Sequence, residues 1–343
     1  MEKIILCTLI LLGSLCAQTY TDMLGRHVEV KSASKLVFLG PGALRLGVYL
    51  GLEERLVGIE KTENDASPLS PYRTFLGKEW IAKLPLVGPG GPGKMPDLEA
   101  LIVLKPDLII TSFVDQNQID LIASKTTIPI LAVSYGASYG GSSQKNLEEI
   151  KASLLLLGEV TQTKARAQTL TAFMKNEEKA LSALKLSPKT LYVGGIGYKG
   201  VQGMTSTEAN YPPFELLGLK NSVFANTDAK GHQFIELEAL LKADPEIIFV
   251  DLFGKAKVEE EYAEKKPLFE SLQAYQKGNV KEVIGYNYYS TNIENLFVIA
   301  WQVAHALGTP VDINSKAKEI FTAFYGEKAD ALLTKLPYHL NQP

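Results

Sequence analysis

A short internal repeat is the feature that most constrains the fold of this chain. Residues 98–110 align without gaps on residues 237–249, and the sequence Leu-Glu-Ala-Leu that begins the first copy also begins the second. Each copy continues to a proline, an acidic residue and an apolar run. This order is typical of a helix with a carboxylate in its first turn, a proline that ends it and a buried parallel strand. Because each half of the chain holds one copy, the repeat predicts two similar lobes.

Strand-like and helix-like patterns alternate in both halves of the chain, which favours parallel sheets covered by helices. The first half has candidate strands at 35–39, 55–59 and 108–111 and candidate helices at 43–50 and 98–104. The second half has candidate strands at 190–193, 247–250 and 280–284 and candidate helices near Phe214, Leu237 and Asn292. A chain of 343 residues also exceeds the size of a single hydrophobic core.

These patterns predict an α/β protein with two Rossmann-like lobes, at residues 19–145 and 189–312. The intervening residues 146–188 have a helical period, interrupted near Gly158, and predict a stiff helical connector. Residues 19–30 predict a short hairpin, and residues 313–343 a C-terminal helical segment.

The first 17 residues have the order of a secretory signal peptide. Lys3 precedes an apolar run from Ile4 to Leu15, which is too short to span a bilayer, and small or polar residues follow. We expect cleavage after Ala17 and a periplasmic location. The alternative is a lipid anchor on Cys16, but Leu15 stands where a lipoprotein signal usually has a small residue.

Several classes of function are disfavoured by composition and motif geometry. A net charge of −3 leaves no basic field for nucleic acid. The glycine-rich segment 88–94 has phosphate-loop spacing, but Met95 follows it and its prolines remove amide donors. The dinucleotide pattern at 195–200 is not followed by a helix, and Arg45 replaces the third glycine of the pattern that begins at Gly40. The sequence therefore predicts no nucleotide cofactor.

Metal-ion capture and catalysis are also disfavoured. The chain has four histidines, and no two have the spacing of metal ligands, so no bare metal site is expected. The sequence shows no set of nucleophile, base and orienting residue, so we expect no catalytic residues. An exported enzyme that uses Glu208 or Glu294 as a base and an adhesive surface protein remain the alternatives from other classes.

Aromatic, amide and cationic residues follow several predicted strands, at the edge where open α/β sheets bind ligands. Tyrosine offers a flat apolar face with one polar end, and arginine makes forked hydrogen bonds, so the set suits a bulky chelate or an oxyanion. The candidate ligand-binding residues are Arg45, Gly90, Gly91 and Lys94 in the first half, and Tyr198, Lys199, Glu208, Tyr211, Tyr286, Asn287, Tyr288 and Tyr289 in the second.

Four motifs resemble those of the class III periplasmic binding proteins, which bind iron complexes and cobalamin. They are Thr21–Arg26, Pro96–Leu101 with Lys105–Asp107, Tyr211–Phe214 and Tyr289–Glu294. The resemblance covers nearly the whole chain after residue 17. It implies two lobes joined by a long connecting helix and a ligand held between them.

The resemblance also implies a function and partners. The expected role is that of a monomeric substrate-binding protein for an ABC importer, which captures an iron complex such as a ferric siderophore or haem. Glu99 and Glu238, which the repeat aligns, match the glutamates with which the family docks on a permease dimer coupled to an ATPase. Cobalamin and an oxyanion such as molybdate or tungstate remain alternative cargoes.

Overall fold

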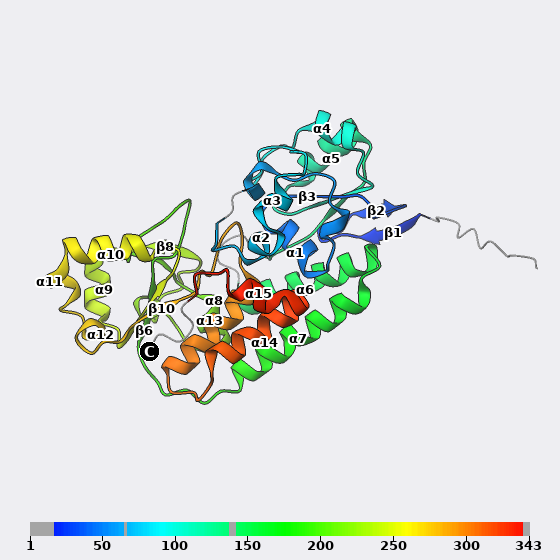
Figure 1. Cartoon of the computed structure of the whole chain (residues 1–343). Helices are drawn as coiled ribbons and strands as arrows, with labels where there is room; N and C mark the ends of the chain where they lie inside the picture. Colours follow the sequence, from blue (N-terminus) through cyan, green and yellow to red (C-terminus); the bar gives the residue numbers. More distant parts are fainter. Residues whose placement is uncertain (1–16, 65–66, 137–141, 339–343) are drawn as a thin grey trace, which may run out of the picture.

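The computed structural model describes residues 17–64, 67–136 and 142–338. The predicted signal peptide lies outside these ranges, apart from Ala17, and so does His339. Within them, no helix combines the length and apolar character needed to cross a membrane. The described residues form two separate three-stranded parallel sheets, which confirms the predicted α/β fold (Figure 1).

The first sheet has the strand order β3-β4-β5, from β3 (Leu36–Leu39), β4 (Leu108–Thr111) and β5 (Ile130–Ala132). All three strands are buried along their whole length, as expected for a sheet covered on both faces. Val37 and Ile109 pack with α4 (Leu98–Leu104) and α5 (Gln116–Thr126). The alternate residues of these strands pack in a second cluster with α1 (Ala43–Tyr49) and α6 (Ser143–Val160).

Two short segments extend the first lobe. The hairpin of β1 (Gln18–Thr21) and β2 (His27–Val30) was predicted and is attached to β5 by the Met23 N–H, which donates to the Ala132 carbonyl. The strand predicted at 55–59 is wrong. This segment makes only single bridges, from Leu56 to Leu36 and from Ile59 to Leu86, because it passes from one neighbour to another before a ladder forms.

The second sheet has the order β10-β9-β6, from β6 (Leu191–Gly194), β9 (Ile247–Asp251) and β10 (Val280–Val283). A two-stranded antiparallel ribbon, β7 (Ser206–Glu208) with β8 (His232–Phe234), lies beside β6. The helices of this lobe are α8 (Pro212–Leu216), α9 (Leu237–Ala243), α10 (Lys255–Glu264), α11 (Lys266–Phe269) and α12 (Gln273–Gln276).

The internal repeat corresponds to one structural unit in each lobe. Helices α4 and α9 have the same length, and each ends in a residue with positive φ, Lys105 at 49° and Asp244 at 36°. The N–H of each of these residues donates back to the helix, and a proline follows before β4 or β9 begins. The shared unit predicted from the repeat is confirmed.

The connecting segment consists of two helices rather than one rod. Helix α6 ends at Val160 and α7 (Lys164–Ser182) begins after a short turn, close to the predicted interruption at Gly158. The helices are in close contact there. A Cβ atom added at Gly158 would lie only 2.5 Å from Cβ of Ala167. Glycine at this position therefore permits the close approach of α6 and α7.

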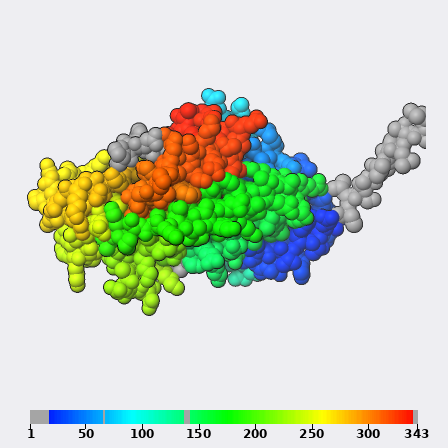
Figure 2. Space-filling model, turned by 90° about the horizontal axis from the view of Figure 1, so that it is seen from below, coloured from blue at the N-terminus to red at the C-terminus, as the bar shows by residue number. Residues whose placement is uncertain are grey.

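Helices α13 (Ile293–Ala306), α14 (Ile313–Tyr325) and α15 (Ala329–Leu333) join α6 and α7 in a layer that runs along both lobes (Figure 2). Glu177 of α7 accepts from Trp301 Nε1 at 2.6 Å and pairs with Lys316 Nζ at 3.0 Å, which ties three helices together. One apolar cluster extends from Phe38 of the first sheet through this layer to Phe249 of the second.

Four shorter elements complete the first lobe. They are the 3-10 helices at Glu53–Arg55 (η1) and Lys61–Asn64 (η2) and the helices α2 (Pro71–Leu76) and α3 (Lys78–Ile81). A 3-10 turn at Ser222–Phe224 (η3) follows α8, and another at Gly326–Lys328 (η4) joins α14 to α15.

Candidate ligand-binding site

A cavity of about 910 Å³ lies between the two lobes. Its volume falls within the range of pockets that enclose a whole small molecule. Both lobes and the start of α6 contribute to its walls, and most of the larger side chains in them are aromatic. The lining includes Pro41, Phe113, Asp115, Gln118, Tyr135, Asn146, Ile150, Tyr198, Lys199, Glu208, His232, Phe253 and residues 286–291.

Many of the candidate residues of the second half line this cavity. Tyr198 and Lys199 follow β6, Glu208 ends β7, and residues 286–289 follow β10. Three strand ends of the second lobe thus converge on one space, as the strand-end argument predicts.

Arg45, Tyr211 and the predicted residues of the glycine-rich loop do not line the cavity. Arg45 is fully buried on α1, and its Nη2 donates to the Tyr288 carbonyl at 2.8 Å and to Asn292 Oδ1 at 2.9 Å. Arg45 therefore does not face the cavity, but stabilises the loop that forms part of the cavity wall. Tyr211 is also fully buried and packs edge-on against Phe214.

The glycine-rich loop contributes Pro92 and Gly93 to the lining, whereas Gly90, Gly91 and the exposed Lys94 lie outside it. Gly90 has a φ of 76°, and a Cβ atom there would lie 2.7 Å from Thr62 Oγ1. The loop thus packs against η2, and Gly91 contacts the second lobe through its amide.

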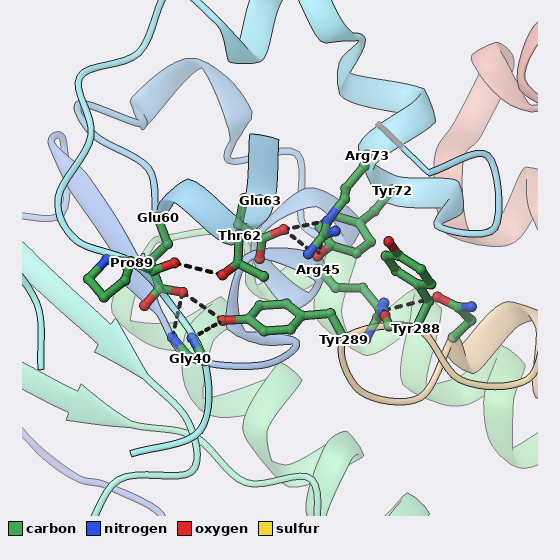
Figure 3. Close-up of polar contacts among 12 residues, drawn as sticks. Gly40, Arg45, Glu60, Thr62, Glu63, Tyr72, Arg73, Pro89, Tyr288 and Tyr289 are labelled. Carbon is green, nitrogen blue, oxygen red and sulfur yellow. Dashed lines mark hydrogen bonds and ion pairs between the residues drawn. The ribbon is translucent and has the colours of Figure 1, made fainter. Parts of the chain in front are cut away.

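Tyr289 joins the two lobes across the edge of the cavity. Its hydroxyl donates to Glu60 Oε2 at 3.0 Å and accepts from the Gly91 N–H at 2.7 Å. Glu60 Oε2 also accepts from the Gly40 N–H at 2.9 Å, and Figure 3 shows the phenol pointing toward this pair. Burial raises the pKa of the Tyr289 phenol well above its ordinary value, so the hydroxyl keeps the proton that it donates.

The loop that carries Tyr289 has an uncommon backbone conformation. Tyr289 has a φ of 51° and Ser290 a φ of 78°, in the left-handed region that non-glycine residues rarely adopt. Such conformations persist where the surroundings determine them, and here the contacts of Arg45 and Glu60 hold the loop.

A buried ion pair lies under the same loop. Arg73 Nε is 2.7 Å from Glu63 Oε2, and both side chains are almost fully buried. The Arg73 guanidinium lies 5.3 Å from the ring centre of Tyr288 and 5.0 Å from that of Tyr289, within cation–π range. Sequence reasoning missed this pair, although Glu63 comes four residues after the strand predicted at 55–59, because Arg73 lies in a short helix with no predicted strand before it.

Three carboxyl groups near the cavity have raised pKa values because burial disfavours their charged forms. The pKa of Glu60, Glu208 and Asp251 is raised to about 7 in each case. Asp251, at the end of β9, accepts from the N–H groups of Tyr286 and Phe253, so it orients the loop that follows β10.

An aromatic pair forms part of the wall in the second lobe. The rings of Tyr198 and His232 are parallel, with an interplanar angle of 6° and centroids 4.1 Å apart. Desolvation lowers the pKa of His232, which therefore stays neutral near pH 7. Its Nε2 lies 2.7 Å from Ser206 Oγ, whose proton goes to the Ile196 carbonyl. His232 was not among the predicted site residues, although it is one of only four histidines.

Histidine, cysteine and carboxylate side chains do not form a metal-binding cluster among the described residues. Across the described ranges, no three histidine, cysteine, aspartate or glutamate side chains gather closely enough to hold an ion.

The two repeat glutamates are exposed. Glu99 belongs to the first turn of α4, and Glu238 to the first turn of α9. In Figure 1 both helices lie on the sides of their lobes that face away from the layer of α7 and α14.

The protein belongs to the periplasmic binding protein family, because the family model matches residues 36–286. Members of this family are substrate-binding proteins of transport systems and not enzymes. A comparison with curated protein sequences finds no match.

Solved structures share the fold along most of their length. The molybdate-binding protein MolA of Haemophilus influenzae, in its molybdate complex, is 21% identical with a TM-score of 0.68, over 90% of this chain and 98% of that one. A periplasmic solute-binding protein of Veillonella parvula is 17% identical with a TM-score of 0.71, over 94% and 97%. The haem-binding protein HutB of Vibrio cholerae is 17% identical with a TM-score of 0.58, over 81% and 100%. These similarities confirm the class III fold.

Proposed function

We propose that this protein captures an iron complex, such as a ferric siderophore or haem, or a related metal chelate, and delivers it to the permease of an ABC importer. The observation that carries the proposal is the 910 Å³ cavity between the lobes, walled by aromatic and amide side chains. Tyrosine and asparagine suit a bulky ligand that has apolar faces and polar edges.

The size and charge of the cavity favour a chelate over a small oxyanion. Of the described lining residues, Lys199 is the one lysine or arginine. A dianion such as molybdate is best held by several cations or converging N–H groups in a small space. MolA shares the fold and binds molybdate, so oxyanion transport remains the second candidate cargo class, and cobalamin the third.

The two glutamates of the internal repeat support the proposed transport partners. Glu99 and Glu238 would each present one carboxylate to a permease dimer, and an ATPase would drive release. We also propose that residues 1–17 direct export to the periplasm, that the lobes occupy 19–145 and 189–312, and that the protein acts as a monomer.

An exported enzyme is less well supported. The Ser206 hydroxyl gives its proton to Ile196, so the proton between Ser206 and His232 belongs to the imidazole. In that arrangement His232 is not a base for Ser206, and Ser206 is itself buried.

The test is to purify the protein from its native periplasm without stripping it, and to identify the bound species by mass spectrometry and elemental analysis. We expect about one equivalent of a metal complex. Adding that complex at one hundred times its dissociation constant should stabilise the empty protein by about 2.7 kcal/mol.

A matched pair of variants locates the binding site. Tyr198→Ala removes a ring from the cavity wall, whereas Tyr20→Ala removes one from β1, outside the cavity. Only Tyr198→Ala should weaken binding. An empty protein that no iron complex, haem, cobalamin or molybdate stabilises would contradict the proposal.

A further inference from the structure

Glu208 occupies a fixed position in the wall of the cavity. It is the last residue of β7 and pairs in register with His232 of β8. Asn221 Nδ2 donates to the Glu208 carbonyl at 3.0 Å and to Thr207 Oγ1 at 2.9 Å, which holds the end of the strand. The Glu208 side chain is partly buried and lines the cavity.

The carboxyl group of Glu208 has no partner among the residues that the structure describes. Within the described part of the chain, no hydrogen bond or ion pair reaches its oxygens. The other buried carboxyls differ: Glu60 accepts from Gly40 and Tyr289, Asp251 from Phe253 and Tyr286, and Glu294 from Tyr49 and Tyr325. Glu208 lines the cavity and its oxygens contact no described residue, so it is the carboxyl of this set that is available to a ligand.

The groups that face Glu208 leave its surroundings negative or neutral. Glu215 of α8 accepts from the N–H and hydroxyl of Ser143, and its charge contributes to the raised pKa of Glu208. His232 is neutral near pH 7, and the pKa values of the Tyr211 and Tyr286 phenols are raised.

The nearest candidate cation of the wall has another contact. The ammonium group of Lys199 lies over the ring of Tyr198, 5.3 Å from its centre, and no ion pair links it to Glu208. On the opposite wall, Asp115 accepts from the Gln118 N–H within the cap of α5. Among the described residues of the wall, none forms an ion pair with Glu208 in this arrangement.

We propose that Glu208 pairs with a positively charged nitrogen group of the cargo, such as a protonated amine carried by a metal complex. This inference rests on the proposed function and narrows its substrate class to cationic or amine-bearing chelates. An ammonium group would supply the hydrogen bonds and the charge that the Glu208 carboxylate lacks.

Binding should be coupled to the ionisation of Glu208. The pKa of its carboxyl is raised to about 7 in the empty cavity, and a bound cation favours the charged form. A proton should therefore leave when the cation binds near neutral pH, and affinity should increase as the pH rises from 6 to 8. A ligand without the positive group should not show this increase.

The test uses two ferric complexes that differ by one charge. Ferrioxamine B carries a pendant ammonium group, and its N-acetyl derivative has the same hydroxamate iron centre without that charge. Titration calorimetry with the full chain should show that the amine complex binds at least about tenfold more tightly than the acetylated one. Glu208→Gln should remove this preference and the pH dependence. Glu236→Gln, an exposed change outside the cavity, should keep both.

The other possible results would contradict either this inference or the proposed function. A preference that survives Glu208→Gln, or tighter binding of the acetylated complex, would overturn the inference. If only haem, molybdate or another anion binds, with unchanged affinity in Glu208→Gln, the inference fails while the transport function stands. If no ligand of any charge binds to a folded protein, the proposed function fails, and this inference with it. Thermal melting of each variant confirms folding.

Discussion

The hydroxyl of Tyr289 donates a hydrogen bond to Glu60, 3.0 Å away, and this contact joins a loop of the second lobe to the first. Both residues are close to the cavity, and the Gly91 amide completes the arrangement by donating to the same hydroxyl. Together with Arg45, this side chain fixes the position of a cavity wall.

Replacing Tyr289 with phenylalanine should loosen this junction. The change leaves the Gly91 N–H without its acceptor and removes one of the two donors to Glu60 Oε2, which should lower the free energy of unfolding by about 1 to 3 kcal/mol. Urea denaturation measures the loss. Tyr20→Phe removes a hydroxyl whose partner, Gln18, is exposed, and should cost less than half as much. Equal losses in the two variants would contradict the role assigned to Tyr289.

Glu60 should make stability decrease as the pH rises. Its pKa is raised from an ordinary 4.5 to about 7 in the folded protein, so the folded state binds the proton more tightly than the unfolded state. The stabilising contribution is complete below pH 4.5 and is lost as the pH rises through 7.

Glu60→Gln tests this pH dependence. Between pH 5 and pH 8, the free energy of unfolding should decrease less in the variant than in the wild-type protein. The difference between the two decreases should be up to about 3 kcal/mol. Urea titrations at several pH values measure the difference. Parallel pH profiles for the two proteins would show that Glu60 does not titrate in this range.

The contact between α6 and α7 predicts a compensating pair of substitutions. Gly158→Ala would place a methyl group 2.5 Å from Cβ of Ala167, which should cost about 1 to 3 kcal/mol of stability. Adding Ala167→Gly makes room for that methyl group, so the double variant should be more stable than the sum of the single changes predicts. Additive losses would mean that the two positions are not in contact.

Glu99 and Glu238 should affect transport without affecting capture. Reversing either charge with Glu99→Arg or Glu238→Arg should lower uptake in cells by about tenfold or more, because an arginine would repel the cations expected on the permease. Ligand affinity of the purified variants should stay within twofold of the wild type. Lys105→Glu, an exposed change just after α4, is the control for added local charge effects. Normal uptake by both variants would rule out the docking role.

Most of the fold could be predicted from the sequence because local signals were strong. Strands such as β4 and β9 are continuous apolar runs after a proline, and α4 and α9 repeat the same four residues. The strand predicted at 55–59 failed for a non-local reason, since its partners change along its length. The interruption predicted near Gly158 corresponds to the turn between α6 and α7, but the close packing of Gly158 against Ala167 is a tertiary contact that periodicity does not predict.

Residues of the candidate site could be predicted where they follow strands. The sequence did not show which of these side chains face the cavity and which are buried behind its wall. Tyr198 and Tyr288 follow strands and line the cavity. Arg45 also follows a strand, but its helix directs the side chain into the protein, where it holds the Tyr288 carbonyl. The pairing of Arg73 with Glu63 could not be predicted, because it joins two short helices that no sequence pattern relates to each other.

The apolar cluster that runs from one sheet to the other limits how cargo can enter. Swinging the lobes wide apart would pull buried side chains such as Phe38 and Phe249 away from the helices that they share, and would expose them to water. Exchange of cargo should instead occur through small displacements of lining loops such as residues 197–200. Empty and loaded forms would then have nearly the same outline, and a membrane partner would distinguish them by local surface changes at the mouth of the cavity.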